Sequence, residues 1–271
     1  MFTRIKEFRQ KDNDVYFFQI VSDKIIINDN YIGILILDSN LDLIKSLTIF
    51  DGITVYSSYV NNYNEELLLF CPDNDCIVHV NLKNYEYKVI HLKNGLESLI
   101  FSTLYEWNDK SLVLTTFKGE FYSICVDKKS IQKIDHDEVV IKYNDLHKLY
   151  QESKNHKSLS MLSNQNIAII DYENLNISIL NYKNQSKHVF NSDTIDFLDM
   201  DSREGILAMV NENSVGIITN NGSKIIYPEE DYLFLKIGLL SRLSNFFIII
   251  LSSSKSNVSN SKVEMFQLCN M

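Results

Sequence analysis

The stretch EELLLFCPDNDCIVHVNL, residues Glu65 to Leu82, contains two apolar runs separated by a short polar segment. Each run has the length of a β-strand, and the residues between them, Pro72 to Asp75, are typical of turns. Cys71 ends the first run and Cys76 begins the second. The stretch therefore predicts a β-hairpin, and its cysteines raise the question whether the hairpin also holds a metal ion or a disulfide bond.

The hairpin pattern recurs along the whole chain. It is found at six places, whose first apolar runs contain Ile25, Leu67, Val113, Ile167, Leu207 and Phe247, at spacings of about 40 to 54 residues. Each hairpin is preceded by another strand-like run, and most are followed by one more. Four short strands in each repeat of about 40–45 residues are typical of a propeller blade. The chain therefore resembles the six-bladed β-propellers as a class.

This resemblance implies an all-β fold of four-stranded antiparallel blades in a single domain, residues 1–271. The sixth unit ends after its third strand, while residues 2–8, FTRIKEF, form a strand-like run with no unit of their own. We therefore expect the N-terminal strand to join the last blade and close the ring, which leaves no blade with an open edge. The expected blades span about residues 9–50, 51–92, 93–135, 136–190, 191–230, and 231–271 with 2–8.

No family motif narrows the resemblance further. Trp107 is the only tryptophan, so the sequence lacks the Trp-Asp blade endings of WD40 propellers. It also lacks a glycine-rich phosphate loop, a nucleophile motif and a recognisable metal-ligand spacing. We therefore expect no cofactor and no metal ion, and the resemblance says little about chemistry.

Charge and hydropathy limit the possible partners. The 271 residues carry a formal net charge of −9, with a pI near 5.2. Phosphates would be repelled, so a nucleic acid is excluded and a basic protein is favoured, although the charge could also serve solubility alone. The start of the chain lacks a secretory signal, and the longest apolar run, Phe246 to Leu251, is too short to span a bilayer. We expect a cytoplasmic monomer that does not bind membranes.

The four cysteines are expected to be reduced thiols in such a compartment. Cys71 and Cys76 would lie opposite each other, close enough for a disulfide bond, but we expect them to stay free. A zinc site would need further ligands, and strand alternation places the nearest histidine, His79, on the face opposite to Cys76. Cys125 and Cys269 are predicted to be buried apolar residues.

One face of the predicted propeller gathers the linkers that enter the first strand of each blade. The start of strand one, the turn between strands two and three and the end of strand four share this face. Each linker contains a carboxylate, and the candidate binding residues are Asp51, Glu97, His136, Asp137, Glu138, Asp193, Glu229, Glu230 and Asp231. The interpretation is an acidic mouth for a cation or a basic peptide; the alternative is that Asp and Glu simply favour loops. Tyr56, Tyr59, Tyr105 and Trp107 are expected near the central channel.

Two long loops elaborate the same face. Residues 136–157 form an insertion in which a short helix is predicted to carry Leu146, His147 and Tyr150 as further binding residues. It would be either a partner-docking lid or a plug of the channel mouth. If residues 138–143 formed an inner strand instead, the insertion would lie on the opposite face. The second loop, residues 252–261, has the composition of a flexible linker, which either closes on a partner or is disordered.

These observations favour a non-catalytic interaction module whose acidic face binds a protein, with neutralisation of a basic toxin as one possible role. The alternative is a hydrolase or lyase with a carboxylate and histidine site at the channel mouth. Its residues would come from His136, Asp137, Glu138, Glu230 and Asp231. The enzyme would need a concave site in which a carboxylate and a histidine lie within hydrogen-bond distance.

Overall fold

The computed structural model describes most of the chain. The described residues are 2–10, 12–61, 64–91, 101–107, 111–116, 120–125, 127–128, 130–142, 157–161, 166–181, 186–192, 195–219, 222–242 and 245–268. Of the predicted residues, Glu97, Leu146, His147, Tyr150, Asp193 and Cys269 lie outside these ranges. The side chains of Tyr105 and Trp107 are likewise outside the described part.

The regular secondary structure of the described residues is almost entirely β-strand, with one short α-helix and one 3-10 turn. The elements are β1 Phe2–Gln10, β2 Phe18–Val21, β3 Lys24–Asp29, β4 Gly33–Leu37, β5 Leu43–Thr48, β6 Ser57–Asn61, β7 Glu66–Cys71, η1 Pro72–Asn74, β8 Cys76–Asn81, β9 Glu86–His91, β10 Phe101–Trp107, β11 Ser111–Thr116, β12 Phe121–Cys125, β13 Ser130–Ile134, α1 His136–Lys142, β14 Lys157–Met161, β15 Ile167–Asp171, β16 Asn176–Asn181, β17 Ser186–Asn191, β18 Asp199–Arg203, β19 Ile206–Asn211, β20 Ser214–Thr219, β21 Gly222–Ile226, β22 Tyr232–Arg242, β23 Asn245–Ser254 and β24 Ser261–Leu268.

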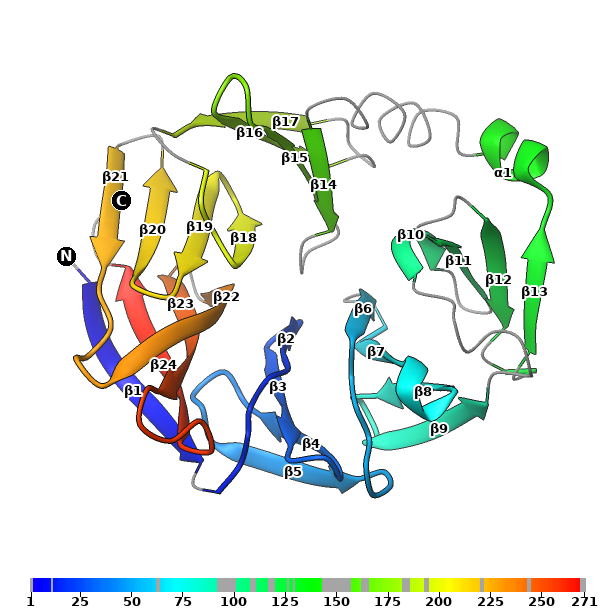
Figure 1. Ribbon diagram of the computed structural model, residues 1–271, viewed down its shortest axis with the longest axis horizontal. Helices are drawn as coiled ribbons and strands as arrows, with labels where there is room; N and C mark the ends of the chain where they lie inside the picture. Colours follow the sequence, from blue (N-terminus) through cyan, green and yellow to red (C-terminus); the bar gives the residue numbers. More distant parts are fainter. Residues whose placement is uncertain are drawn as a thin grey trace.

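The strands of the described part form six antiparallel sheets of four strands each. We number the sheets in chain order: sheet 1 is β2–β5, sheet 2 is β6–β9, sheet 3 is β10–β13, sheet 4 is β14–β17, sheet 5 is β18–β21, and sheet 6 is β22–β24 with β1. The sheets are arranged around a common centre, with the first strand of each nearest the centre and the fourth outermost (Figure 1). This is the meander order that the repeat predicted.

The two ends of the chain lie side by side in sheet 6. Strand β1 pairs antiparallel with β24 along its whole length, from Phe2 opposite Leu268 to Gln10 opposite Ser261. The outermost strand of the last sheet therefore comes from the N-terminus, as expected from the missing strand of the last unit.

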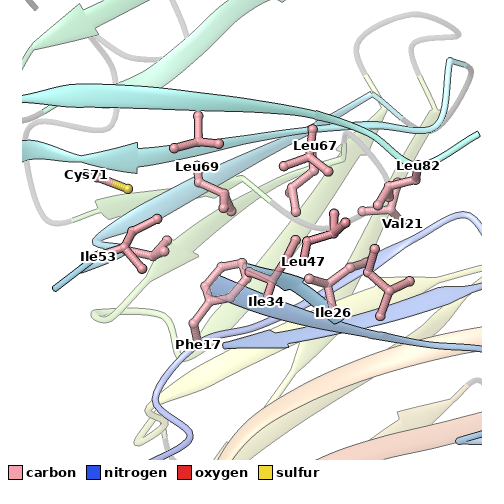
Figure 2. Packing of buried hydrophobic residues seen from close by; sticks show 14 of the residues in the cluster. Phe17, Val21, Ile26, Ile34, Leu47, Ile53, Leu67, Leu69, Cys71 and Leu82 are labelled. Carbon is pink, nitrogen blue, oxygen red and sulfur yellow. The ribbon is translucent and has the colours of Figure 1, made fainter. Parts of the chain in front are cut away.

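The apolar runs form the middle strands because these strands are covered on both sides. Ile25, Ile26 and Ile27 of β3 are fully buried, and all five residues of β4 are buried. The outer strand β5 is exposed at five of its six positions. Neighbouring sheets pack face to face, as in the cluster between sheets 1 and 2 that contains Ile34 and Leu67 (Figure 2). Continuous apolar runs thus identify strands buried on both faces.

Two alternatives considered for the loops are wrong. Residues 138–142 belong to the helix α1 rather than to an inner strand, and the first strand of sheet 4 is β14. The run 252–261 is not a flexible linker, because Ser252 to Ser254 and Ser261 lie in β23 and β24 and are buried. The short connection between them is fixed by backbone hydrogen bonds, among them Ser254 N–H to the Asn260 carbonyl at 3.0 Å.

Candidate binding face and central cavity

The linkers and the turns between second and third strands share one face, which we call the linker face. The side-chain amide of Asn74, in the η1 turn, donates to the Gly52 carbonyl at 2.9 Å, and its oxygen accepts the Thr54 N–H at 2.9 Å. In sheet 6 the Lys255 ammonium donates to the Glu230 carbonyl at 2.8 Å. Side chains of the turns therefore hold the linkers in place.

Asn28 has the same role in sheet 1 and is almost fully buried. Its side-chain oxygen accepts the N–H groups of Tyr16 and Phe17, both at 2.9 Å, and its amide donates to the Asp14 carbonyl at 2.6 Å. The Tyr16 hydroxyl in turn donates to the Ile53 carbonyl of the next linker at 3.3 Å. The linker face is therefore a hydrogen-bonded surface rather than a set of independent loops.

Several predicted binding residues lie on this face with uncompensated charge. Asp51, Glu138, Glu230 and Asp231 are exposed. None of these four carboxylates forms an ion pair within the described ranges. They are available to a partner that approaches this face.

Glu229 is placed differently, because its carboxylate is used inside sheet 6. It accepts a hydrogen bond from Lys262 Nζ at 2.7 Å and another from Arg4 of β1. The hydrogen bonds from Lys262 and Arg4 lower the pKa of Glu229 to about 2. Lys262 has a fully buried side chain, which also contacts the buried Glu264 at 3.1 Å. Glu229 therefore helps to attach β1 and β24 to the linker before β22.

The acidic residues after β13 form the start of α1. The Asp135 carboxylate accepts the Asp137 N–H at 2.8 Å, which caps the helix, and Asp137 and Glu138 occupy its first turn, where acidic side chains are favourable. The His136 Nδ1 lies 3.5 Å from Asp137 Oδ1, and both side chains are mostly exposed. Helix α1 lies at the outer rim, on the other side of the ring from the linker between β21 and β22 (Figure 1). The two acidic clusters therefore do not form one carboxylate pair.

The opposite face, which we call the turn face, carries more balanced charge. Lys24 pairs with Glu65 at 2.5 Å, Lys6 of β1 pairs with Asp42 at 2.5 Å, and Lys88 pairs with Asp127 at 3.6 Å. Asp42, Glu65 and Asp127 on this face are thus each paired with a lysine, whereas Asp51, Glu138, Glu230 and Asp231 on the linker face have no ion-pair partner within the described ranges.

A central cavity of about 220 Å³ lies between the first strands of sheets 1, 2, 5 and 6. Tyr56 lines it and is 58% exposed, as predicted for a channel residue, whereas Tyr59 is buried. The Ser58 hydroxyl donates to the side-chain oxygen of Gln19 at 3.0 Å across the cavity wall. Gly238 of β22 allows the close approach of β2, because a Cβ there would lie 2.4 Å from Ile20 Cδ1.

Three polar residues of β18, which sequence reasoning did not single out, connect sheet 5 to sheet 6. Asp199 accepts the Ile237 N–H at 3.1 Å, Asp201 accepts the Leu239 N–H at 2.8 Å, and Arg203 donates to the Leu239 carbonyl at 3.2 Å. They satisfy backbone groups at the inner edge of β22. Burial raises the pKa of Asp199, and the nearby Lys236 opposes this only in part. Their alternation in the sequence is the signal that could have identified them.

The cysteines of the hairpin between β7 and β8 face each other. Cys71 and Cys76 are register partners, both are free, and both are fully buried. The hydrogen bond with Cys76, together with burial, raises the pKa of the Cys71 thiol. Cys76 packs between sheets 1 and 2, whereas His79, three residues further along β8, lies on the other face of its sheet, as strand alternation predicted. Cys125 is half-buried rather than buried.

Comparisons with known proteins agree on the fold. No family model and no curated protein matches the sequence. The β-propeller domain of Cps50 (Swd1) from Myceliophteria thermophila aligns with a TM-score of 0.58 at 7% identity, covering 99% of this chain and 100% of that one. KlHsv2 with loop 6CD replaced by a Gly-Ser linker aligns with a TM-score of 0.55 at 10% identity, covering 90% and 95%. A streptogramin B lyase aligns with a TM-score of 0.46 at 13% identity, covering 98% and 88%.

The first two likenesses, at such low identity, concern the fold alone. Together with the radial four-stranded sheets, they define the chain as a member of the β-propeller class. No specific family within that class is identified. Within the described ranges, no helix is long and apolar enough to cross a membrane.

Proposed function

We propose that this protein is a single-domain propeller of six blades, closed into a ring by β1, that binds a basic protein partner through its linker face. In this proposal the protein is a cytoplasmic monomer without catalytic activity. The observation that carries the proposal is the distribution of charge between the two faces. On the linker face, Asp51, Glu138, Glu230 and Asp231 are exposed and have no described ion-pair partner. On the turn face, Asp42, Glu65 and Asp127 are each paired with a lysine.

This asymmetry favours a cationic partner of large area over a small ligand. The acidic residues are spread around the ring rather than gathered in one pocket, so a partner that contacts all of them must cover the face. Each contact on such a surface is weak, because exposed charges are screened by water and salt. Summed over the face, they would attract and orient a basic surface. A basic toxin is one partner of this chemistry.

The enzymatic alternative, a hydrolase or lyase at the channel mouth, has less support. It requires a histidine and a carboxylate converging on a concave site. His136 and Asp137 are exposed at the outer rim, and Glu230 and Asp231 lie across the ring from them. Their arrangement suits a binding surface better than an acid–base pair.

A peptide-binding experiment with matched variants tests the proposal. The probe is a fluorescent decalysine peptide, and its affinity is measured by anisotropy at low and at physiological salt. The first variant neutralises the linker face by Asp51→Asn, Glu138→Gln and Asp231→Asn. The control variant neutralises the turn face by Asp23→Asn, Asp42→Asn and Glu204→Gln, so both change the net charge equally.

The linker-face variant should bind about tenfold more weakly, and the turn-face variant less than about twofold more weakly. The affinity of the unmodified protein should fall steeply with salt. Equal losses in the two variants would mean that only net charge matters, and the linker face would then have no special role. Absence of binding to the unmodified protein at low salt would also contradict the proposal.

A further inference from the structure

A second candidate site lies on the turn-face half of sheet 2, away from the linker face. A cavity of about 650 Å³ is bounded by strands β7, β8 and β9 and by the turn before β13 of sheet 3. Glu66, Asn81 and Glu86 stand opposite one another in one cross-strand row, and His79 and Lys88 belong to the neighbouring row. These polar residues interrupt the face of sheet 2 that does not pack on sheet 1.

The innermost polar group of this cavity is a histidine paired with a carboxylate. His79 is 8% exposed, and its Nε2 lies 3.2 Å from Glu66 Oε1. Burial lowers the pKa of His79, which favours the neutral imidazole. A carboxylate can only accept, so Nε2 carries the hydrogen and Nδ1 is left as an acceptor. Nδ1 has no partner among the described residues.

The carboxylates of the cavity have neutral hydrogen-bond partners. Within the described part of the chain, Glu66 accepts hydrogen bonds only from His79 and from the Asn61 amide, the latter at 3.5 Å. Glu86 accepts the Asn84 amide at 2.8 Å. Lys88 lies nearer the rim and is paired with the exposed Asp127. The charges of Glu66 and Glu86 therefore remain uncompensated, and Glu66 is mostly buried.

Three features define the ligand that would fit this arrangement. The excess of negative charge requires a cation, and the acceptors on Glu66 and His79 require N–H donors. The described residues contain no group of three metal-ligating side chains, so the arrangement suits an organic cation. Glu66 and Glu86 are two strands apart in the same row, which corresponds to about 10 Å along the sheet. We propose that this cavity binds a linear aliphatic diamine or polyamine, with one ammonium on Glu66 and His79 and the second on Glu86.

Calorimetry on the full chain tests this proposal with 1,4-diaminobutane as the probe. The variants are Glu66→Gln and Glu86→Gln, and the matched control is Glu65→Gln, a neighbouring carboxylate that pairs with Lys24 and does not line the cavity. Each cavity variant should weaken binding about 10- to 100-fold, and the control should leave it unchanged. Glu86 is exposed, so its variant retains the fold even if Glu66→Gln is destabilised.

Two further probes separate the diamine from other cations. 1-Aminobutane should bind more weakly than 1,4-diaminobutane and should be insensitive to Glu86→Gln. Magnesium chloride at equal concentration should not compete. The proposal is overturned if the diamine does not bind at millimolar concentration, if both cavity variants bind as well as the control, or if magnesium competes equally. None of these outcomes bears on the decalysine experiment, because the linker face lies at the other ends of the strands.

Discussion

At the scale of single residues, Asp199 offers a test of how the sheets are joined. Its side chain is half-buried beside the central cavity, desolvation raises its pKa, and its carboxylate accepts the N–H of Ile237. A carboxyl group whose pKa is higher in the folded state favours folding at low pH, and this contribution is lost as the pH rises through the folded-state value. Relative to a neutral side chain of the same shape, this carboxyl group therefore makes folding less favourable as the pH rises.

We predict that Asp199→Asn, which keeps an oxygen for the Ile237 N–H but removes the charge, raises Tm at pH 7. The increase should be about 2–4 °C, the shift that about 1 kcal/mol produces in a domain of this size. The difference from the unmodified protein should shrink as the pH falls toward 4, as measured by thermal unfolding at several pH values. Asp196→Asn, an exposed carboxylate of the preceding linker, is the control and should have no effect. A pH-independent change would contradict the explanation.

The sequence identified carboxylates on the linker face but could not distinguish their roles. Asp51 and Glu229 both lie in linkers. Only Glu229 forms ion pairs, with Arg4 and Lys262. Those partners are far away in the sequence and meet Glu229 only because β1 and β24 lie together. The role of Asp199 was not predicted for the same reason, because its hydrogen-bond partner Ile237 belongs to the next sheet. The alternation of Asp199, Asp201 and Arg203 places them on one face of a strand, but nothing in the local sequence identifies their partners in the next sheet.

At the scale of the element, Gly33 shows how tightly one hairpin is built. It begins β4 and stands opposite Thr48 of β5. A Cβ at Gly33 would lie 1.9 Å from the carbonyl oxygen of Leu47, which belongs to the backbone and cannot turn away like a side chain. By contrast, a Cβ at Gly216 of β20 would meet nothing within 4 Å.

We therefore predict opposite results for two alanine substitutions at strand glycines. Gly33→Ala should destabilise the protein by about 1–3 kcal/mol, the usual range for overpacking a closely packed position. Gly216→Ala should be neutral or stabilise by up to about 1 kcal/mol, because it removes the extra chain freedom of glycine in the unfolded state. Urea unfolding measures both. Equal effects would show that β5 can move away from β4 at little cost.

The middle strands were predictable from the sequence, whereas the first strands were less so. Burial on both faces makes the middle strands continuous apolar runs, such as residues 67–70. The first strand of sheet 5, Asp199–Arg203, carries polar side chains that bond to the neighbouring sheet, so no apolar run marks its position in the sequence. Turns were also hard to locate, because Tyr85 and Leu175 adopt left-handed conformations that usually indicate glycine.

At the scale of the whole molecule, the period of the sequence repeat was enough to predict most of the fold. Six hairpins at similar spacing predicted six similar sheets, and the run FTRIKEF predicted the strand that completes sheet 6. The insertion after β13 was recognisable from its length alone, and it begins with a helix that was not predicted, α1 at residues 136–142. The expected helix falls outside the described residues. Repetition predicts what the units share and says little about what distinguishes one from another.

Pairing of β1 with β24 would make the stability of the ring depend on contact between the two ends of the chain. Thr3 and Gln267 are register partners in this pair, at a separation that suits a disulfide bond between antiparallel strands. We predict that the variant Thr3→Cys with Gln267→Cys forms this bond on mild oxidation and gains about 2–4 kcal/mol over its reduced form, because the link constrains nearly the whole unfolded chain. Peptide mapping identifies the bond, and urea unfolding of the oxidised and reduced forms measures the gain. The single variant Thr3→Cys, which retains the native thiols, should show no such gain. If the bond forms without stabilising the protein, the junction of the two ends does not limit unfolding, and unfolding begins at another boundary between sheets.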